Sequence, residues 1–319
     1  MGCDTQPINI AQGILQALSD LPFQLNVAFF GTSDVLEQIS QHPLITLFPA
    51  QEVISMDDDP LLAIRRKKNS SLCLAMNMLK DGTLDALISA GNTGALIAAA
   101  TLSLPKLPGI DRPALLTLLP TKKHPVAVLD VGANPHVKAE YLLQYAAIGL
   151  AFQKCRGIEH PTIGLLNIGS EAEKGTPELR NAYKALERLN HLPHARKKFI
   201  GNIEGRDVFN GNVDVLVTDG FTGNVFLKTA EGIASFILQE IEAYAGDSLI
   251  LHLPLLRKRL HYAEYPGAVV SGIEGIVIKC HGDGSPNAFC ESLKATCRLL
   301  EQDFLKRIKV ELTSNVLGT

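Results

Sequence analysis

Residues 85–102 read DALISAGNTGALIAAATL, and this stretch indicates a strand, a tight loop and a helix in direct succession. The same order recurs along the chain in four further places: QLNVAFF before a helix from Asp34, VAVLDV before one from Lys138, TIGLLNI before one near Glu178, and VDVLVTD before one from Thr222. Continuous Val, Leu and Ile runs suit strands that are buried on both faces. We therefore predict an α/β fold in which helices cover a mainly parallel sheet on both sides.

Glycine, together with Asn, Asp or Ser, follows nearly every predicted strand. The endings are SAGNTG at 89–94, DVGANP at 130–135, NIGSE at 167–171, GNIEGRD at 201–207, TDGFTGN at 218–224 and HGDGSPN at 281–287. Loops after parallel strands meet at the carboxyl edge of a sheet, where ligands bind. We expect these loops to surround one cleft. The alternative for each loop is a strand-to-helix turn without a ligand.

The composition places no strong global constraint on partners. The 319 residues carry a net charge of −3, so bulk attraction to nucleic acid or to an anionic bilayer is not expected. The six cysteines form no C-x-x-C pair, which predicts reduced thiols, a cytoplasmic location and no metal. No apolar stretch reaches the roughly 20 residues that a membrane-spanning helix needs.

Two regions interrupt the alternation of strands and helices. Residues 57–71, DDDPLLAIRRKKNSS, predict a helix with Pro60 in its first turn, a basic end, and a new helix capped by Ser70 or Ser71. The basic cluster either complements the helix dipole or binds an acidic partner. Residues 233–262 predict a helical hairpin with an apolar side. Three alternatives for that side are packing in the core, packing against a second copy, and contact with a bilayer surface.

Asn side chains, loop amides and few charges suit an oxyanion or a phosphate. Cations that follow predicted strand ends are Lys174, Arg206 and Lys228, each of which could equally form a surface salt bridge. The chain contains no P-loop, no dinucleotide fingerprint and no G-x-S-x-G elbow. His124, His136 and His281 are the histidines near these loops, and a lone loop histidine is more often solvated than catalytic. We therefore expect catalysis by positioning and electrostatics, without a covalent nucleophile.

Several stretches together resemble the bacterial phosphate acyltransferases of phospholipid synthesis. They are, in order, DPLLAIRRKKNSSLCLA, DALISAGNTGALIAAA, LPGIDRPALLTLLPT, VLDVGAN, IGLLNIGSEAEKG, FIGNIEGRDVF, VLVTDGFTGNVFLKTAEG and HGDGSPNA. The resemblance implies transfer of a fatty acyl group from acyl carrier protein to inorganic phosphate, without a cofactor. The product, acyl phosphate, would serve a membrane glycerol-3-phosphate acyltransferase. It also implies a homodimer with the three-layer α/β/α architecture of phosphotransacetylases and isopropylmalate dehydrogenases, cytoplasmic and peripherally bound to the membrane.

The site residues that we expect combine the loop pattern with this resemblance. Phosphate would be held by Lys174, Arg206 and amides around Gly91, Gly94 and Gly223, with Thr93, His281 and Asn287 also binding substrate. Asn92, Asn134 and Asn224 would donate hydrogen bonds to the thioester oxygen. Asp219 would orient Lys228 or manage the phosphate proton. Carrier docking is assigned first to Arg65, Arg66, Lys67 and Lys68, and second to Lys122–Lys123 and 196–198; membrane contact is assigned to Leu251, Leu253, Leu255 and Leu256.

The chain departs from the family pattern at its first residues. It begins inside a turn that in the family follows a first strand, so we expect a single α/β domain over 1–319 whose first strand lies upstream of Met1. This early start weakens the case for Asp4 as a site residue, and Cys3, which replaces a glycine of that turn, disfavours a close approach of the backbone to a ligand there.

Two other functions remain open at this stage. One is a phosphotransacetylase-like enzyme that uses coenzyme A thioesters. The other is a scaffold without activity that docks lipid-synthesis enzymes at the membrane.

Overall fold

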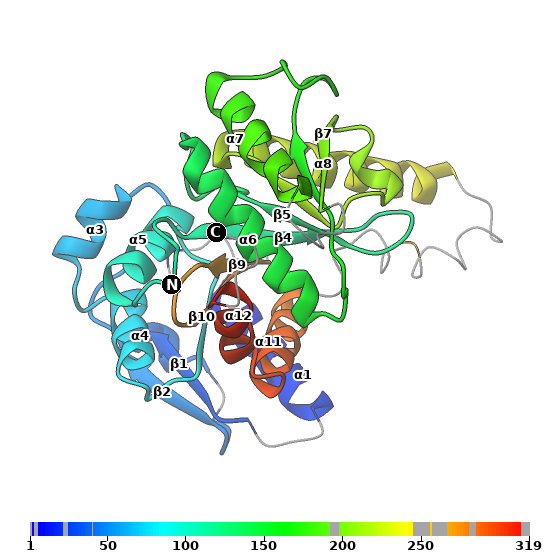
Figure 1. Cartoon of the computed structure of the whole chain (residues 1–319). Coiled ribbons are helices and arrows are strands. Elements are labelled where there is room, and N and C mark those ends of the chain that lie inside the picture. Colours follow the sequence, from blue (N-terminus) through cyan, green and yellow to red (C-terminus); the bar gives the residue numbers. More distant parts are fainter. Residues whose placement is uncertain are drawn as a thin grey trace. The chain divides into compact units, whose positions relative to one another are not determined.

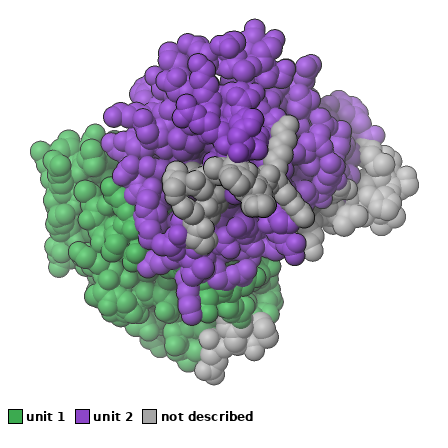
Figure 2. Space-filling view, in the orientation of Figure 1, with its two compact units in different colours: residues 1–106, 264–305 green, residues 107–263, 306–319 purple. Residues whose placement is uncertain are grey.

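The computed structural model of the chain describes residues 2, 6–21, 25–39, 41–191, 198–244, 256, 267–280 and 285–313. The chain forms two compact units, each built from two segments (Figure 2). Unit 1 contains residues 1–106 and 264–305, and unit 2 contains residues 107–263 and 306–319. The expectation of a single domain over 1–319 stays a prediction.

Unit 1 carries two small sheets covered by helices. The first sheet pairs β1 (Val27–Gly31) with β2 (Ile45–Pro49) in parallel. In the second, β10 (Ile276–Lys279) lies between β3 (Ala86–Ser89), to which it is parallel, and β9 (Ala268–Ser271), to which it is antiparallel. The helices of unit 1 are α1 (Pro7–Asp20), α2 (Ser33–Leu36), α3 (Pro60–Arg66), α4 (Ser71–Lys80), α5 (Thr93–Ser103) and α11 (Pro286–Glu301).

Unit 2 has a sheet with the order β4-β5-β8-β6-β7. Its strands are β4 (Ala114–Leu119), β5 (Val126–Leu129), β6 (Ile163–Leu166), β7 (Phe199–Ile203) and β8 (Val215–Val217). All neighbours are parallel except β4, which runs antiparallel to β5. The helices are α6 (Ala139–Cys155), α7 (Pro177–Arg188) and α8 (Gly220–Tyr244), with short 3-10 turns at Leu189–His191 and Val208–Asn210. A last helix, α12 (Phe304–Thr313), begins in unit 1 and ends in unit 2.

The cores follow from the apolar runs. Every residue of β4, β5 and β6 is buried, as expected for strands that are covered on both faces. Helix α6 packs on β5 and β8. In unit 1, α1 lies beside α11 although the two are far apart in the sequence (Figure 1). The α/β class and the mainly parallel pairing predicted from the sequence are therefore confirmed.

A cavity of about 490 Å³ lies in unit 1 between the edges of β1 and β3. Successive residues 26–30 and 85–89 line it. Because side chains alternate between the two faces of a strand, residues from both faces of β1 and of β3 border the cavity. Among the described residues, β1 and β3 each pair with another strand on one side only, and the cavity lies at their other edges. Apolar side chains such as Ile14, Phe48 and Leu293 line the rest of the space. The cavity thus separates two strand edges that still have hydrogen-bonding capacity.

The region of the expected hairpin is only partly described. Helix α8 continues without a break through the start that we assigned at Ile233, so the first arm of the hairpin is the end of one 25-residue helix. Leu251, Leu253 and Leu255 lie outside the described residues, whereas Leu256 is helical and half-buried. Across the described ranges, every helix is too short or too polar to cross a membrane.

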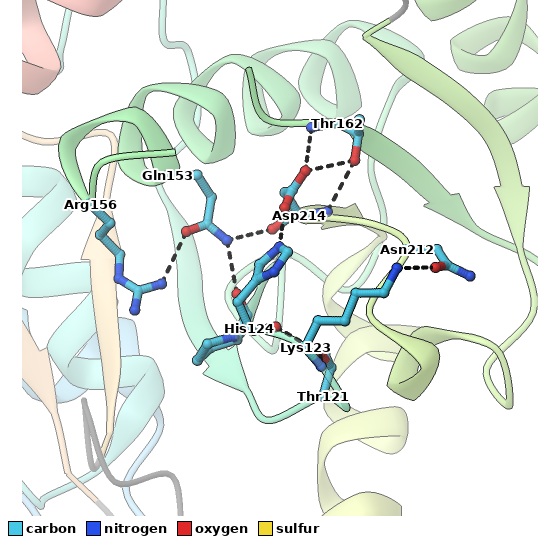
Figure 3. A network of polar contacts seen from close by, with 9 residues as sticks. Thr121, Lys123, His124, Gln153, Arg156, Thr162, Asn212 and Asp214 are labelled. Carbon is cyan, nitrogen blue, oxygen red and sulfur yellow. Dashed lines mark hydrogen bonds and ion pairs between the residues drawn. The ribbon is translucent and has the colours of Figure 1, made fainter. Parts of the chain in front are cut away.

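A polar network ties together the amino ends of the unit 2 strands (Figure 3). The carboxylate of Asp214, directly before β8, accepts hydrogen bonds from the amide (2.7 Å) and the hydroxyl (2.8 Å) of Thr162 and contacts Nε2 of His124. From α6, Gln153 donates to the carbonyls of Asp214 (2.6 Å) and Pro125 (3.1 Å). This network lies at the edge opposite to the Gly- and Asn-rich loops, which gives it a structural role.

Candidate active site

The loops singled out in the sequence do follow parallel strands. In unit 2, β5, β8, β6 and β7 are mutually parallel, so the loops that begin at residues 130, 167, 203 and 218 lie at one edge. In unit 1, SAGNTG follows β3, and residue 280 onward follows the parallel strand β10. Each unit thus presents a polar loop edge of its own.

Asn92 organises the SAGNTG loop through its side chain. Its Oδ1 accepts a hydrogen bond from the amide of Ala95 (3.0 Å) and caps α5. Its Nδ2 donates to the carbonyls of Ser55 (3.2 Å), Met56 (3.1 Å) and Asp58 (3.2 Å). The residue is buried, and both amide protons point to main-chain oxygens. Asn92 therefore positions the loop, and its expected hydrogen bond to a thioester stays a prediction.

The other expected residues of this loop have different surroundings. A Cβ atom on Gly94 would lie 2.6 Å from Cγ of Pro60, so glycine lets α5 approach α3 closely. The amide of Gly91 donates to Oγ of Ser89 (3.2 Å), and Thr93 begins α5. These contacts make the loop a compact, well-defined turn.

Lys279 is a cation at this loop that we did not anticipate. It ends β10, and its Nζ donates to the carbonyl of Ala90 (3.2 Å) and to that of Cys280. The sequence signal was a lysine directly after the apolar run IVI, at the carboxyl end of a strand. His281 lies outside the described residues, and Asn287 is exposed in the first turn of α11.

Asp130 organises the DVGANP loop of unit 2 and was also missed. Its buried carboxylate accepts hydrogen bonds from the amides of Leu115 (3.0 Å), Gly132 (3.1 Å), Ala133 (2.9 Å) and Asn134 (2.7 Å). Burial raises the pKa of Asp130, and these hydrogen bonds oppose that rise. The signal in the sequence was an acidic residue inside an otherwise apolar strand end, VLDVG.

The same network engages Asn134. Its Nδ2 donates to the carbonyl of Pro113 (2.7 Å) and to the carboxylate of Asp130 (3.0 Å). Both protons of this amide are thus also held by the protein, and the expected donation of Asn134 to substrate stays a prediction. Asn224, in contrast, is exposed, and no hydrogen bond of its side chain is found within the described ranges. Its Oδ1 lies 3.6 Å from where a Cβ on Gly132 would stand, which places it over the DVGANP loop.

The start of α8 requires glycine and an aspartate cap. A Cβ on Gly223 would lie 1.9 Å from the carbonyl oxygen of Asp130, so Gly223 lets the helix approach the end of β5. Asp219 accepts hydrogen bonds from the amide and the hydroxyl of Thr222, both at 2.8 Å. Lys228 pairs with Glu231 at 2.8 Å. These contacts give Asp219 a capping role at the start of α8, and the expectation that Asp219 orients Lys228 stays a prediction.

The two remaining expected phosphate ligands are both exposed. Arg206 has 78% of its side chain exposed and lies near Glu204 (3.4 Å) and Asp207 (3.8 Å). Lys174 forms no ion pair with any residue that the structure describes, and its side chain runs past Gly169. In unit 2, Lys174 and Asn224 are thus the expected groups best placed to meet a ligand.

The cysteines do not supply a nucleophile in the described part of the chain. Cys73, Cys155, Cys280, Cys290 and Cys297 are buried and free. Burial raises the pKa of Cys280 to about 11, so its thiol is protonated near neutral pH.

Comparison with known proteins identifies the family. The model of the family described as fatty acid synthesis protein matches residues 1–307. A phosphate acyltransferase of Chlamydia abortus is 41% identical over 320 residues, which cover 98% of this chain and 97% of that protein. A phosphate acyltransferase of Brevibacillus brevis is 40% identical over 332 residues, which cover 100% of this chain and 97% of the relative.

Solved structures agree on the fold. A phosphotransacetylase from Streptococcus pyogenes aligns with a TM-score of 0.59 at 15% identity, covering 92% of this chain and 93% of that chain. A branched-chain phosphotransacylase from Enterococcus faecalis aligns with a TM-score of 0.58 at 15% identity, covering 94% and 97%. The expected likeness to phosphotransacetylases is confirmed at the level of the fold. The chain belongs to the fatty acid synthesis protein family, together with relatives named phosphate acyltransferase.

Proposed function

We propose that this chain transfers a fatty acyl group from acyl carrier protein to inorganic phosphate. The observation that carries the proposal is about 40% identity, over nearly the whole length, to proteins named phosphate acyltransferase. The polar loop edges support it, because they offer Lys174, Lys279 and the exposed Asn224, and the described cysteines are buried. Such a site is adequate, because the thioester has a good leaving group and phosphate is already an anion near neutral pH.

The reaction needs little covalent help from the protein. An oxygen of hydrogen phosphate attacks the thioester carbonyl carbon, the carbon–sulfur bond breaks, and the thiolate takes the proton from phosphate. The products are acyl phosphate and the free thiol of the carrier. The protein has to orient the two substrates and stabilise the negative charge that develops on the carbonyl oxygen.

The described side chains suggest which groups perform these tasks. In unit 2, Lys174 would attract phosphate and Asn224 would donate a hydrogen bond to the oxyanion. In unit 1, Lys279 would add positive charge beside the SAGNTG loop. Asn92, Asn134 and Asp130 act as positioning residues, because their polar atoms are held by the main chain.

The wider cellular role is part of the proposal. Acyl phosphate is a reactive mixed anhydride, so a membrane enzyme that acylates glycerol 3-phosphate is the expected consumer. We further propose a cytoplasmic homodimer with peripheral membrane contact. Exposed apolar side chains on α8, including Ile233, Phe236 and Ile237, support packing against a second copy or a bilayer.

The test is to incubate the purified chain with long-chain acyl carrier protein and phosphate and to measure acyl phosphate by mass spectrometry. Lys174→Ala and Asn224→Ala should each lower the rate by about 10²-fold, the usual range for one electrostatic group. Lys184→Ala, on the exposed side of α7, is the matched control and should retain the activity of the unmodified chain.

A second candidate follows from the fold, which is shared with phosphotransacetylases. Equal or faster turnover with coenzyme A thioesters than with acyl carrier protein would favour that function. No acyl phosphate from either donor, with dimerisation and liposome binding intact, would favour the scaffold instead.

A further inference from the structure

We propose that the exposed face of α3 is the docking surface for an acidic, amphipathic helix of the acyl carrier. This inference rests on the proposed function and adds the contact surface and its apolar anchors. The α3 face consists of Met56, Leu61, Leu62, Arg65, Arg66 and Lys68.

The face combines apolar and cationic side chains in a regular arrangement. Leu61 and Arg65 are four residues apart and share one ridge of the helix, and Leu62 and Arg66 share the next. Leu61, Leu62 and Met56 leave 53%, 47% and 42% of their surface exposed, whereas Ala63 and Ile64 are buried below them. Exposed apolar side chains that lie together, here with Met and Arg among them, mark a candidate interaction surface.

The structure revises which cations are available for docking. Lys67, one of the four basic residues first assigned to the carrier, turns inward: its Nζ contacts the carbonyl of Val53 (2.8 Å) and the carboxylate of Asp58 (2.5 Å). Lys67 therefore holds α3 in place. Arg65, Arg66 and Lys68 remain exposed.

The second-choice basic surfaces fit a partner less well. Lys122 and Lys123 donate to Asn210 (2.9 Å) and Asn212 (2.8 Å) at the amino edge of the unit 2 sheet, and Figure 3 shows the pair formed by Lys123. Lys122 and Lys123 therefore lie at the opposite edge of this sheet from the Gly- and Asn-rich loops. Residues 196 and 197 lie outside the described residues, and burial lowers the pKa of Lys198.

Two sets of contacts within unit 1 join the α3 segment to the SAGNTG loop, and a further ion pair closes the segment itself. Asn92 holds the carbonyls of residues 55, 56 and 58, the Lys67–Asp58 ion pair closes the segment before α3, and Gly94 packs on Pro60. A carrier that binds α3 is therefore seated on the same rigid block as the loop that begins α5. The helix that binds the carrier and the loop that would receive its thioester would thus be held together by the same contacts.

The charge pattern favours a protein helix over a bilayer. The segment before α3 carries exposed Asp57 and Asp59, at the opposite end from the arginines. An anionic membrane is a plane and would approach both ends together, whereas an acidic helix can align with the basic half and place its apolar side on the leucines. Charge complementarity thus selects a short acidic helix as the partner.

The experiment compares two thioester donors of the same acyl chain: acyl carrier protein, which needs docking, and acyl-pantetheine, which does not. KM for the acyl carrier protein should rise by about tenfold in Leu61→Ser/Leu62→Ser and in Arg65→Glu/Arg66→Glu. For Arg65→Glu/Arg66→Glu, which reverses charge, the rise should be largest at low salt. Turnover of acyl-pantetheine should stay unchanged. Matched controls in unit 1 are Leu102→Ser, which alters an equally exposed leucine, and Lys80→Glu/Lys106→Glu, which reverses two exposed lysines elsewhere.

Three results would overturn the inference. The first is an unchanged KM for the acyl carrier protein in both α3 variants, and the second is an equal loss with both donors, which would indicate damage to the site. The third is loss of sedimentation with anionic phosphatidylglycerol vesicles in Arg65→Glu/Arg66→Glu while carrier binding persists. If the unmodified chain turns over neither donor, the proposed function fails, and fluorescence anisotropy with labelled acyl carrier protein still decides whether α3 binds it.

Discussion

Replacement of Asn92 separates the two structural tasks of its side chain. Asn92→Ser keeps an oxygen that can cap α5 but removes the donor to the carbonyls of residues 55, 56 and 58. Two amide protons are lost, and at about 0.5–1.5 kcal/mol each the free energy of unfolding should fall by about 1–3 kcal/mol. Asn92→Ala also removes the cap, for a further loss of about 1 kcal/mol.

Asn92→Asp provides the third member of the series. The carboxylate still caps α5 and suits the positive end of the helix dipole, but its second oxygen faces main-chain carbonyls. We expect it to be less stable than Asn92→Ser for that reason. Urea unfolding of the full chain measures all three, and activity should fall in parallel because the loop is displaced.

The reasoning on Asn92 fails under two outcomes. One is an Asn92→Ala variant whose free energy of unfolding lies within about 0.5 kcal/mol of the unmodified chain, a change expected of a surface site. The other is a variant with normal stability and no activity, which would return Asn92 to direct contact with substrate.

Two further predictions follow from contacts in the two units. Gly223→Ala, whose Cβ would lie 1.9 Å from the Asp130 carbonyl, should destabilise the fold by about 1–3 kcal/mol in urea unfolding, whereas Gly232→Ala in the same helix meets no atom within 4 Å and should not. The hydrogen bond from Lys67 lowers the pKa of Asp58 below its ordinary value of 3.8, so the stability that it gives is lost as the pH falls through that lowered pKa. Amide protection factors over residues 53–68, which correct for the intrinsic exchange rate at each pH, should fall in that range, and Lys67→Met should abolish this step.

Local patterns in the sequence were sufficient for much of the fold. The strands at 86–89, 126–129 and 163–166, the helix after the SAGNTG loop and the cap at Ser70 appear where the apolar runs and the loop and Ser signals predicted them. The HGDGSPN loop predicted a strand before it, which is β10, but we did not identify β9 from the sequence alone. Each has four residues, and their antiparallel pairing depends on partners brought together by the fold.

The roles of individual site residues could not be read in the same way. An Asn in a strand-end loop can face a ligand or a carbonyl, and the sequence does not distinguish the two. Asn92 meets Ser55 across 37 positions, and Asn134 meets Pro113 across 21. Gly223 was expected to offer an amide to phosphate, whereas its missing side chain is what the packing against Asp130 requires. Long-range contacts therefore decided which polar groups remained available.

The most direct test of the proposed function follows the atoms of phosphate. The chain is incubated with long-chain acyl carrier protein and phosphate labelled with heavy oxygen, and the products are identified by mass spectrometry. We expect acyl phosphate that retains all the labelled oxygen atoms, because a phosphate oxygen becomes the bridge to the acyl carbon. Free fatty acid as the only product, or no product at all, would contradict transfer of the acyl group to phosphate.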